Sequence, residues 1–294
     1  MVPQKIQLKK IRDLSDNLSD SFQFIRQEFK PLVKSFPIIS GVFLIANSIL
    51  TGLFQKDTFG FLEALEKGGV YDNPRFIDSF FTPTYFLVIG FSYLSLLAMR
   101  VALASYMKLY HASTSSPAIE EVWKCFIRFF PKVLLYSIPE FLLIIIGLIF
   151  CLLPGIYLLV VLTPFQFILV FEGTNFNETF KRCYAIIKNN FWISLGIYLI
   201  AYIIYSFASG IIGLVVSILA GVVSYLTTKE MSTTFSVSIS ILNFIGYAFY
   251  LVFLVAAFLN YTSIAESNDA SGFTERLSHL GEKEDLHKNL EEEY

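Results

Sequence analysis

Trp192–Leu226 is a stretch of 35 residues without Asp, Glu, Lys or Arg. A helix of that length is about 52 Å long at 1.5 Å per residue, whereas about 20 apolar residues cross the hydrocarbon core of a bilayer. Because lipid cannot hydrogen-bond to exposed backbone, a membrane-crossing chain is limited to helices and closed barrels. The run has no alternation of period two, so it predicts membrane-spanning helix.

Further apolar runs support the same fold class: Phe36–Phe54, Pro83–Met107, Val133–Leu153, Ile156–Phe171 and Phe235–Leu259. We predict an all-α polytopic membrane bundle with six transmembrane helices. Pro154-Gly155 is a turn signal between the two central runs. We expect residues 192–226 to form one span with a kink near Gly210–Gly213. Two short spans of about 17 residues each are the alternative.

Composition agrees with a membrane protein. The chain is 55% hydrophobic and 16% charged, whereas a soluble domain carries about 25% charged residues. The first apolar run begins only near Phe36, which is too late for a cleavable signal peptide, so we expect it to be retained as an anchor. The three cysteines are far apart in the sequence and are expected to be free thiols.

Amphipathic segments precede the apolar pairs. In residues 5–34 the apolar residues recur at steps of three and four, which places them on one helical stripe: Ile11, Leu14, Leu18, Phe22, Ile25, Phe29 and Leu32. This helix is expected in the membrane interface, docked on the protein's own cytoplasmic face, or in both environments at once. Pro117–Phe130 and Asn177–Asn190 are two further amphipathic helices.

These segments form an internal repeat, in which an amphipathic interfacial helix is followed by a hairpin of two spans, three times over. The repeat divides the chain into a cytoplasmic amphipathic helix (1–34), a six-span transmembrane domain (35–265) and an acidic cytoplasmic tail (266–294). Within the tail, Gly272–Leu280 is predicted to form a short docked helix.

The distribution of Lys and Arg predicts the orientation, since cytoplasmic loops carry an excess of positive residues. With six spans and a cytoplasmic N-terminus, 18 of the 22 basic residues lie inside and 4 outside. The sequence therefore predicts a multi-pass protein of the bacterial inner membrane with both termini cytoplasmic. A seventh span within 192–226 would move the C-terminus to the other side.

Two ionisable residues lie inside predicted spans. Arg100 is seven residues before the end of the second span, and Glu140 is seven residues after the start of the third. At 1.5 Å per residue both lie about 10 Å below the same surface. Charged residues inside a membrane usually face a partner or a water-filled cavity. We therefore expect an intramembrane ion pair between Arg100 and Glu140, with snorkelling of Arg100 and a protonated Glu140 as the alternative.

Small residues recur every fourth position along 192–226. Ser209, Gly213, Ser217 and Gly221 are predicted to form a helix-packing ridge, because small side chains let two membrane helices approach closely. Conserved chemistry-bearing patterns such as Walker, GxGxxG, HExxH and GxSxG motifs do not occur. We expect no catalytic residues, no cofactor and no metal site. Basic residues are fewer than acidic ones, which disfavours nucleic-acid binding.

The central unit resembles a family of six-span bacterial inner-membrane proteins. The residues that carry the likeness are Pro154-Gly155-Ile156, Glu172 at the end of a span, and the stretch from Glu178 to Trp192. The pattern is similar to the membrane domain that some bacteria fuse to glycerophosphodiester phosphodiesterases. The catalytic domain of those enzymes is missing here, so the resemblance implies topology and location and no catalytic residues.

Three functions fit these observations. The leading hypothesis is a non-enzymatic scaffold that organises partner proteins or lipids at the cytoplasmic face of the inner membrane. The alternative is a transporter or channel for a lipid or small solute, since repeats and intramembrane charges are typical of that class. A membrane-embedded enzyme is third, because it needs several polar residues converging at one depth.

Overall fold

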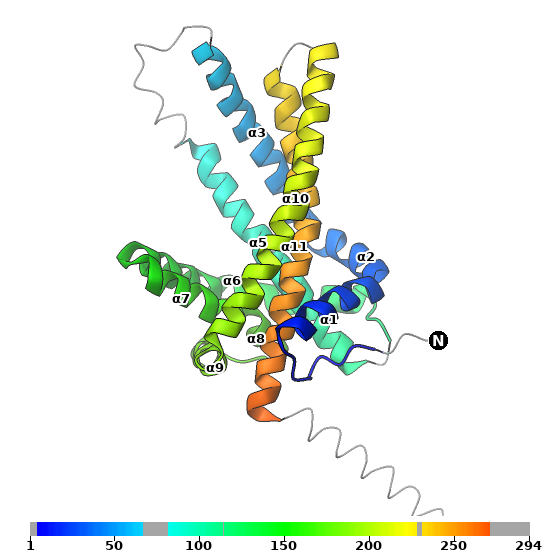
Figure 1. Cartoon of the computed structure of the whole chain (residues 1–294), viewed down its shortest axis with the longest axis vertical. Helices are drawn as coiled ribbons and strands as arrows, with labels where there is room; N and C mark the ends of the chain where they lie inside the picture. Colours follow the sequence, from blue (N-terminus) through cyan, green and yellow to red (C-terminus); the bar gives the residue numbers. More distant parts are fainter. Residues whose placement is uncertain (1–4, 67–81, 114, 228–230, 271–294) are drawn as a thin grey trace, which may run out of the picture.

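The computed structural model describes residues 5–66, 82–113, 115–227 and 231–270 (Figure 1). Within these ranges all regular structure is helical. In chain order the helices are α1 (Leu14–Gln27), α2 (Phe29–Ile39), α3 (Gly41–Glu66), α5 (Pro83–Ala112), α6 (Ile119–Phe150), α7 (Leu152–Leu162), α8 (Phe165–Phe171), α9 (Phe176–Ile187), α10 (Phe191–Thr227) and α11 (Met231–Asp269). The predicted all-α fold is confirmed for this part of the chain.

The candidate spans within the described residues number five: Pro83–Ala112, Ile119–Phe150, Leu152–Phe171, Phe191–Val223 and Val237–Asp269. A sixth is obtained if Phe29–Ile39 and Gly41–Lys56, which meet at 65°, are counted as one bent span. The prediction of a polytopic membrane protein is confirmed, and the predicted six spans require this bent pair. The predicted first span, Phe36–Phe54, is not one straight helix, because the bend lies inside it.

The bend between α2 and α3 lies at Ser40. Pro37, inside α2, has no backbone N–H, and its ring crowds the carbonyl four residues earlier. The Ser40 hydroxyl donates to the Phe36 carbonyl at 2.7 Å, a local bond that often bends helices. The Ser40 N–H also donates to Phe36 O, and the Leu44 N–H donates to Ser40 O. The chain therefore changes direction without leaving these backbone groups unpaired.

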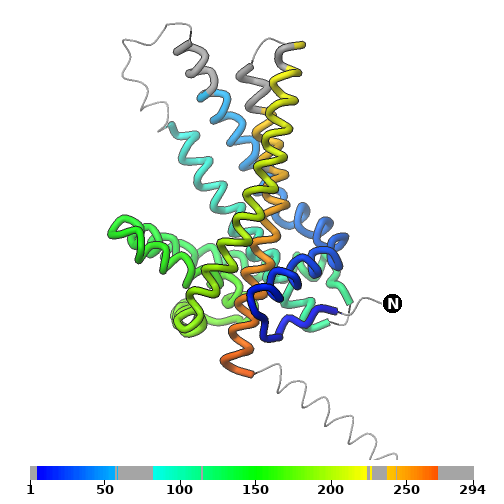
Figure 2. The backbone as a smooth tube through the Cα atoms, in the orientation of Figure 1, coloured from blue at the N-terminus to red at the C-terminus, as the bar shows by residue number. Residues whose placement is uncertain are grey.

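Four helices lie along the long axis of the molecule, and a hairpin lies across them. Figure 1 and Figure 2 show α3, α5, α10 and α11 rising together, with α1, α2 and α9 gathered near one end of the bundle. We call this the basal end. The α6–α7 hairpin runs across the view at the level of the lower half of α10. The six-helix bundle of the prediction is thus a group of long helices with an inclined hairpin beside it.

The turn of this hairpin lies at Cys151, whose extended backbone separates α6 from α7. Pro154-Gly155, predicted as the turn, instead lies in the first helical turn of α7, where a missing N–H costs no intrahelical bond. The prediction of the turn residues was therefore wrong by a few positions. A Cβ on Gly155 would lie 2.7 Å from the Leu148 Cα, and one on Gly147 would lie 3.2 Å from the Gly155 Cα. The two helices approach closely because both positions are glycine.

The long C-terminal pair is simpler than the sequence suggested. Helix α10 is continuous over 37 residues, so the alternative of two short spans is wrong. Helix α11 is continuous to Asp269, beyond the predicted span Phe235–Leu259, and the expected boundary between membrane domain and tail falls inside it. The predicted tail helix Gly272–Leu280 lies outside the described residues.

The three predicted amphipathic helices are not all separate helices in the structure. The second, Pro117–Phe130, is not a separate element, because α6 is continuous from Ile119 through Pro131 to Phe150. The third is α9, which begins with a capping box between Asn175 and Glu178. Such a box satisfies two of the free N–H groups at a helix start. The predicted internal repeat of a helix followed by a hairpin is therefore only partly reproduced in the fold.

The first amphipathic segment is docked on the protein itself. The residues of its predicted apolar stripe differ in burial, because Leu32 is buried while Phe22 and Phe29 are exposed. Helix α1 packs against α11 and α10. Its buried residues are Asn17, Ser21 and Phe24, and Leu14, Leu18 and Ile25 of the stripe are partly buried against the core. The Phe24 ring makes edge-to-face contacts with Tyr106 and Tyr110 of α5. Of the two predicted environments, the described structure shows the docked one.

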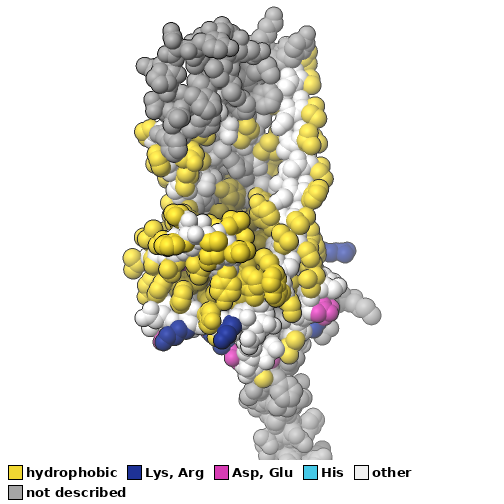
Figure 3. Space-filling model, turned by 60° about the vertical axis from the view of Figure 1, so that its left-hand side comes forward, with side chains coloured by type: hydrophobic (Ala, Val, Ile, Leu, Met, Phe, Trp, Pro, Cys, Tyr) yellow, Lys and Arg dark blue, Asp and Glu magenta, His cyan; other side chains and the backbone are white. Residues whose placement is uncertain are grey.

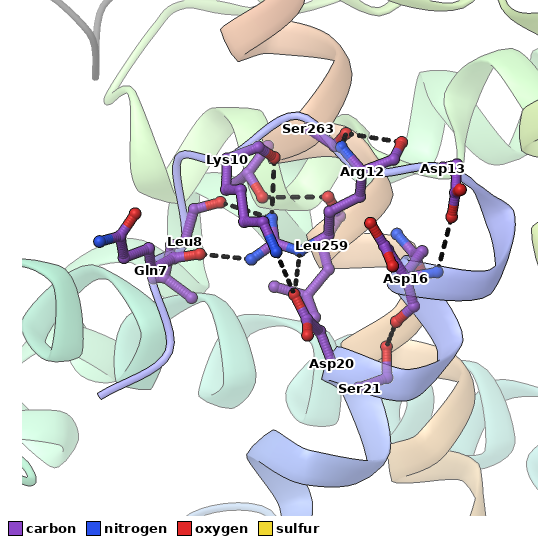
Figure 4. A network of polar contacts seen from close by, with 12 residues as sticks. Gln7, Leu8, Lys10, Arg12, Asp13, Asp16, Asp20, Ser21, Leu259 and Ser263 are labelled. Atoms are coloured by element: carbon purple, nitrogen blue, oxygen red, sulfur yellow. Dashed lines mark hydrogen bonds and ion pairs between the residues drawn. The ribbon is translucent and has the colours of Figure 1, made fainter. Parts of the chain in front are cut away.

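A buried arginine holds the segment before α1 in place (Figure 4). The Arg12 side chain is fully buried, and its Nε donates to Asp20 Oδ2 at 2.8 Å. Its remaining donors bind the backbone carbonyls of Gln7, Leu8 and Lys10. The Arg12 backbone N–H donates to the Ser263 hydroxyl at 2.8 Å. Because a guanidinium has five N–H donors, one side chain ties this segment to α1, and its backbone ties it to α11.

Replacing Gly155 by alanine should open the α6–α7 turn. The added Cβ meets the Leu148 backbone, which cannot move as a side chain can, so we expect a loss of about 1–3 kcal/mol in the free energy of unfolding. Denaturant titration in mixed micelles measures it. Gly210→Ala on α10 is the matched control, because a Cβ there meets nothing within 4 Å. An equal effect of both changes would contradict the close approach.

Replacing Arg12 by glutamine should release the segment that precedes α1. Removing one partner of a buried ion pair typically costs about 3–5 kcal/mol. We expect tryptic cleavage after Lys9 and Lys10 to become at least about tenfold faster, since local opening exposes these sites. Arg26→Gln, in the last turn of α1 and exposed, is the control. Unchanged cleavage in Arg12→Gln would refute the role of Arg12.

Candidate functional site

A hollow with one polar end lies between the inclined hairpin and the long helices. It has a volume of about 450 Å³ and is lined by side chains of α5, α6, α7, α8, α10 and α11. Most of its wall is apolar: Leu96, Leu97, Phe141, Ile144, Ile156, Leu159, Val160, Leu162, Leu195, Leu199 and Phe253. Its polar groups are Arg100, Glu140, Gln166, Thr163 and four tyrosines. We call it the intramembrane cavity.

Arg100 and Glu140 both line this cavity, and Gln166 connects them. The Arg100 Nη1 donates to Gln166 Oε1 at 3.1 Å. The Gln166 Nε2 in turn donates to Glu140 Oε2 at 2.5 Å. The ion pairs found among the described residues do not include a direct Arg100–Glu140 contact. The structure thus places the two residues of the expected pair at one site, joined through an amide.

Gln166 was not among the sequence candidates. It is a single amide in the otherwise apolar run Phe165–Phe171, and a lone polar residue in a membrane span was the available signal. Its position depends on a helix break, because α7 ends at Leu162 and Pro164 caps the start of α8. Proline supplies no N–H to continue α7. The separate helix α8 then places Gln166, which is 1% exposed, between α5 and α6.

Tyrosine hydroxyls complete the polar end of the cavity. Tyr93 donates to the Ser137 carbonyl of α6 at 3.0 Å. The Tyr198 hydroxyl accepts from Asn260 Nδ2 at 3.3 Å, which leaves the Tyr198 proton available for another acceptor. The hydroxyl of Tyr250 lies next to the Arg100 guanidinium. The polar end therefore carries one cation, one carboxylate and several hydroxyl groups.

The cavity opens toward the side of the molecule. Several lining residues are also part of the outer surface, with Leu159 48%, Leu199 54% and Tyr202 52% exposed. They belong to α7 and α10, so the mouth lies between these two helices. Figure 3, which brings the hairpin side forward, shows that the described lower half of this face is mostly hydrophobic, with charged side chains below. In a bilayer such a mouth faces lipid rather than water.

A second set of polar contacts continues away from the cavity along α3, α5 and α11. Ser92 donates to Asn47 Oδ1 at 3.0 Å, and Asn47 Nδ2 donates to the Tyr247 hydroxyl at 2.8 Å. Asn47 is 1% exposed. Tyr247 is one helical turn before Tyr250 of the cavity. Buried polar groups therefore extend beyond the cavity into the part of the bundle farther from the basal end.

The predicted helix-packing ridge lies on α10. Ser209, Gly213, Ser217 and Gly221 are all partly buried, and α10 packs chiefly against α11. A Cβ added to Gly246 of α11 would lie 3.9 Å from the Ser209 hydroxyl. A Cβ on Gly213, however, would meet nothing within 4 Å. The ridge thus faces the α11 side at Ser209, without the close backbone approach at Gly213 that its spacing suggests.

At the basal end, Arg182 of α9 joins two other elements. It donates to Glu172, at the end of α8, at 3.4 Å and forms an ion pair with Asp269 at the end of α11. The hydrogen bond with Asp269 is the main cause that raises the pKa of Arg182, and Glu172 adds to it. Tyr261 donates to the same Glu172 carboxylate at 2.6 Å. These contacts hold α9 against the end of α8 and the end of α11.

Within the described residues, no three His, Cys, Asp or Glu side chains come together as a metal site would need. Cys125, Cys151 and Cys183 are free thiols. Burial raises the pKa of Cys183 well above its ordinary value. A thiol in such surroundings is a poor nucleophile.

No protein-family model, curated protein or solved structure matches this chain.

The connection through Gln166 predicts an energetic coupling. Residues in one hydrogen-bond network typically couple by about 0.5–3 kcal/mol, and by about 0.6 kcal/mol on average inside membranes. A double-mutant cycle with Arg100→Ala and Glu140→Ala should therefore give losses smaller than additive. In a Gln166→Leu background the coupling should fall toward zero, because leucine fills the space but bonds to neither partner.

The measurement is the free energy of unfolding in mixed micelles for all eight combinations. The cycle of Arg100→Ala with Ser217→Ala, a partly buried residue of α10 that does not line the cavity, is the control and should be additive. A coupling that survives Gln166→Leu would mean that Arg100 and Glu140 interact without the amide.

Proposed function

We propose that this chain is a non-enzymatic, multi-pass protein of the bacterial inner membrane that binds lipid and thereby organises lipids and partner proteins at the cytoplasmic face. The observation that carries this proposal is the intramembrane cavity with an apolar wall, one polar end and a mouth facing the bilayer. An amphipathic molecule fits both parts of such a wall. Pockets of about 300–1,000 Å³ hold molecules of drug size, so a cavity of about 450 Å³ accommodates part of a lipid, with the rest lying in the bilayer.

The orientation is part of the same proposal. The basal end carries α1, α2 and α9, whose sequences contain the basic residues Arg26, Lys30, Lys34, Lys181 and Arg182. Positive residues favour the cytoplasmic side, so the basal end faces the cytoplasm and both termini lie there. The proposed relation to six-span inner-membrane proteins that resemble the phosphodiesterase-fused membrane domain agrees with this placement.

Transport of a lipid or small solute is the second candidate. The observation that favours it is the set of buried polar contacts among Ser92, Asn47 and Tyr247, which extends from the cavity toward the other end of the bundle. Polar groups at successive depths are typical of substrate pathways. A binding protein needs the cavity alone, whereas a transporter also needs this second part.

Blocking the mouth of the cavity tests lipid binding. Leu199→Trp places a larger side chain at the opening between α7 and α10, so we expect the protein to lose most of the lipid that it retains through purification in detergent. Native mass spectrometry of the purified protein counts the retained lipid. Leu219→Trp, on an exposed part of α10 that does not line the cavity, is the matched control and should retain lipid as the wild type does.

Two results would decide against the proposal or refine it. Wild-type protein that retains no lipid would contradict lipid binding in the cavity. Movement of labelled lipid between leaflets of proteoliposomes, abolished by Asn47→Leu, would favour the transporter over the binding protein.

A further inference from the structure

We propose that the intramembrane cavity selects a lipid with an anionic headgroup, a phosphate or a carboxylate, and that Arg100 binds this group. The inference rests on the proposed lipid-binding function and adds the charge of the ligand. It follows from the different exposure of the Arg100 and Glu140 side chains and from the hydroxyl donors beside them.

Arg100 is the only Lys or Arg among the described residues that line the cavity. A guanidinium has five N–H donors and no acceptor, and Gln166 takes a donor of Nη1. Gln166 therefore fixes one edge of the planar group, and Tyr250 lies beside it. A planar fork held in this way matches the two oxygens of a carboxylate or phosphate, which arginine commonly binds with two parallel hydrogen bonds.

The carboxylate of Glu140 does not cancel this preference, because it is covered. Glu140 is 4% exposed, and its Oε2 accepts from Gln166 at 2.5 Å. Arg100 is partly exposed. Glu140 and Gln166 line the cavity as well, but both side chains are almost fully covered, so an anion in the cavity contacts more of the guanidinium than of the carboxylate. The Coulomb attraction to the guanidinium is stronger in such surroundings than in water.

Hydroxyl groups add donors around the same point. Tyr198, which lines the cavity, accepts from Asn260, so its own proton is available to another acceptor. An oxygen-rich headgroup supplies such an acceptor, whereas a purely apolar ligand supplies none.

The apolar wall completes the assignment of a lipid rather than a free anion. Leu159 and Leu199 lie at the mouth, and both are about half exposed on the outer surface. A headgroup at Arg100 is therefore connected to the bilayer through an apolar opening, along which an acyl chain can lie. A free phosphate would have to cross the same apolar opening without its water.

The test compares two lipids that differ in headgroup charge. Wild-type protein in micelles is titrated with dioleoylphosphatidylglycerol, which is anionic, and with dioleoylphosphatidylcholine, which is zwitterionic, and binding is read by native mass spectrometry. Both headgroups carry a phosphate, but phosphatidylcholine adds a quaternary ammonium that repels the guanidinium in a site of low dielectric, so the anionic lipid should be favoured by about tenfold or more. This comparison needs no variant, so it does not depend on whether a substitution folds.

Variants then assign the preference to Arg100. Arg100→Gln should reduce the preference to about twofold or less while the phosphatidylcholine affinity changes little, and Arg100→Lys should retain part of it. Arg128→Gln is the matched control, because Arg128 is an exposed residue of α6 outside the cavity. A preference lost equally in Arg128→Gln would place the anion at the surface and overturn the assignment.

The remaining outcomes separate this inference from the proposed function. Equal binding of the two lipids by the wild type overturns the anionic headgroup and leaves lipid binding standing, whereas binding of neither lipid overturns both. Competition with glycerol 3-phosphate tests whether the ligand is instead a soluble phosphate ester. If it displaces phosphatidylglycerol at concentrations comparable to those of the lipid, the ligand is a free phosphate ester and the proposal of a lipid ligand is wrong. If it does not, the proposal of a lipid ligand is supported.

Discussion

Every backbone N–H and C=O inside hydrocarbon must be paired within the protein, and the breaks in these helices obey that requirement. At Cys151 the chain is extended, yet the Cys151 N–H donates to Gly147 O and the Gly155 N–H donates back to Cys151 O. At the α7–α8 break, Thr163 N–H donates to Leu159 O, and Ile168 N–H donates to Pro164 O. The helices therefore end and restart inside an apolar region without leaving these groups unpaired. The inclined hairpin and the separate α8 depend on this property.

The α7–α8 break lies beside the cavity, since Thr163 and Gln166 both line it. The sequence predicted one span over Ile156–Phe171, and the structure divides it into α7 and α8 at Thr163 and Pro164. Gln166 of α8 lies between Arg100 and Glu140 and bonds to both. Residues of α7 and α10 form the wall of the cavity opposite α5.

The basal end holds the helices that frame this cavity. Arg12 fastens the segment before α1 to α1 and α11, and the Glu28 carboxylate accepts from Tyr106 of α5 at 2.6 Å and from Ser116 at 2.8 Å. Lys5 donates to the carbonyls of Tyr110 and Ser113 at the end of α5, where the helix dipole favours a cation. Arg182 links α9 to α8 and α11. These charged residues of the basal end therefore act as internal connections, because each has a partner on a neighbouring element.

The sequence by itself determined the class of structure. Long uncharged runs can exist in a bilayer only as helices, so the all-α fold and the membrane location followed from Trp192–Leu226 and its counterparts. It also identified Arg100 and Glu140, because ionisable residues inside apolar runs are conspicuous. Only the tertiary structure decided that Cys151 rather than Pro154-Gly155 is the turn, that Asn17, Ser21 and Phe24 of α1 are more deeply buried than its apolar stripe, and that Gln166 joins the two charges. Hydrophobic periodicity reports how much of a segment avoids water. It does not report which neighbour a side chain meets, since lipid and protein interior are equally apolar and only packing distinguishes them.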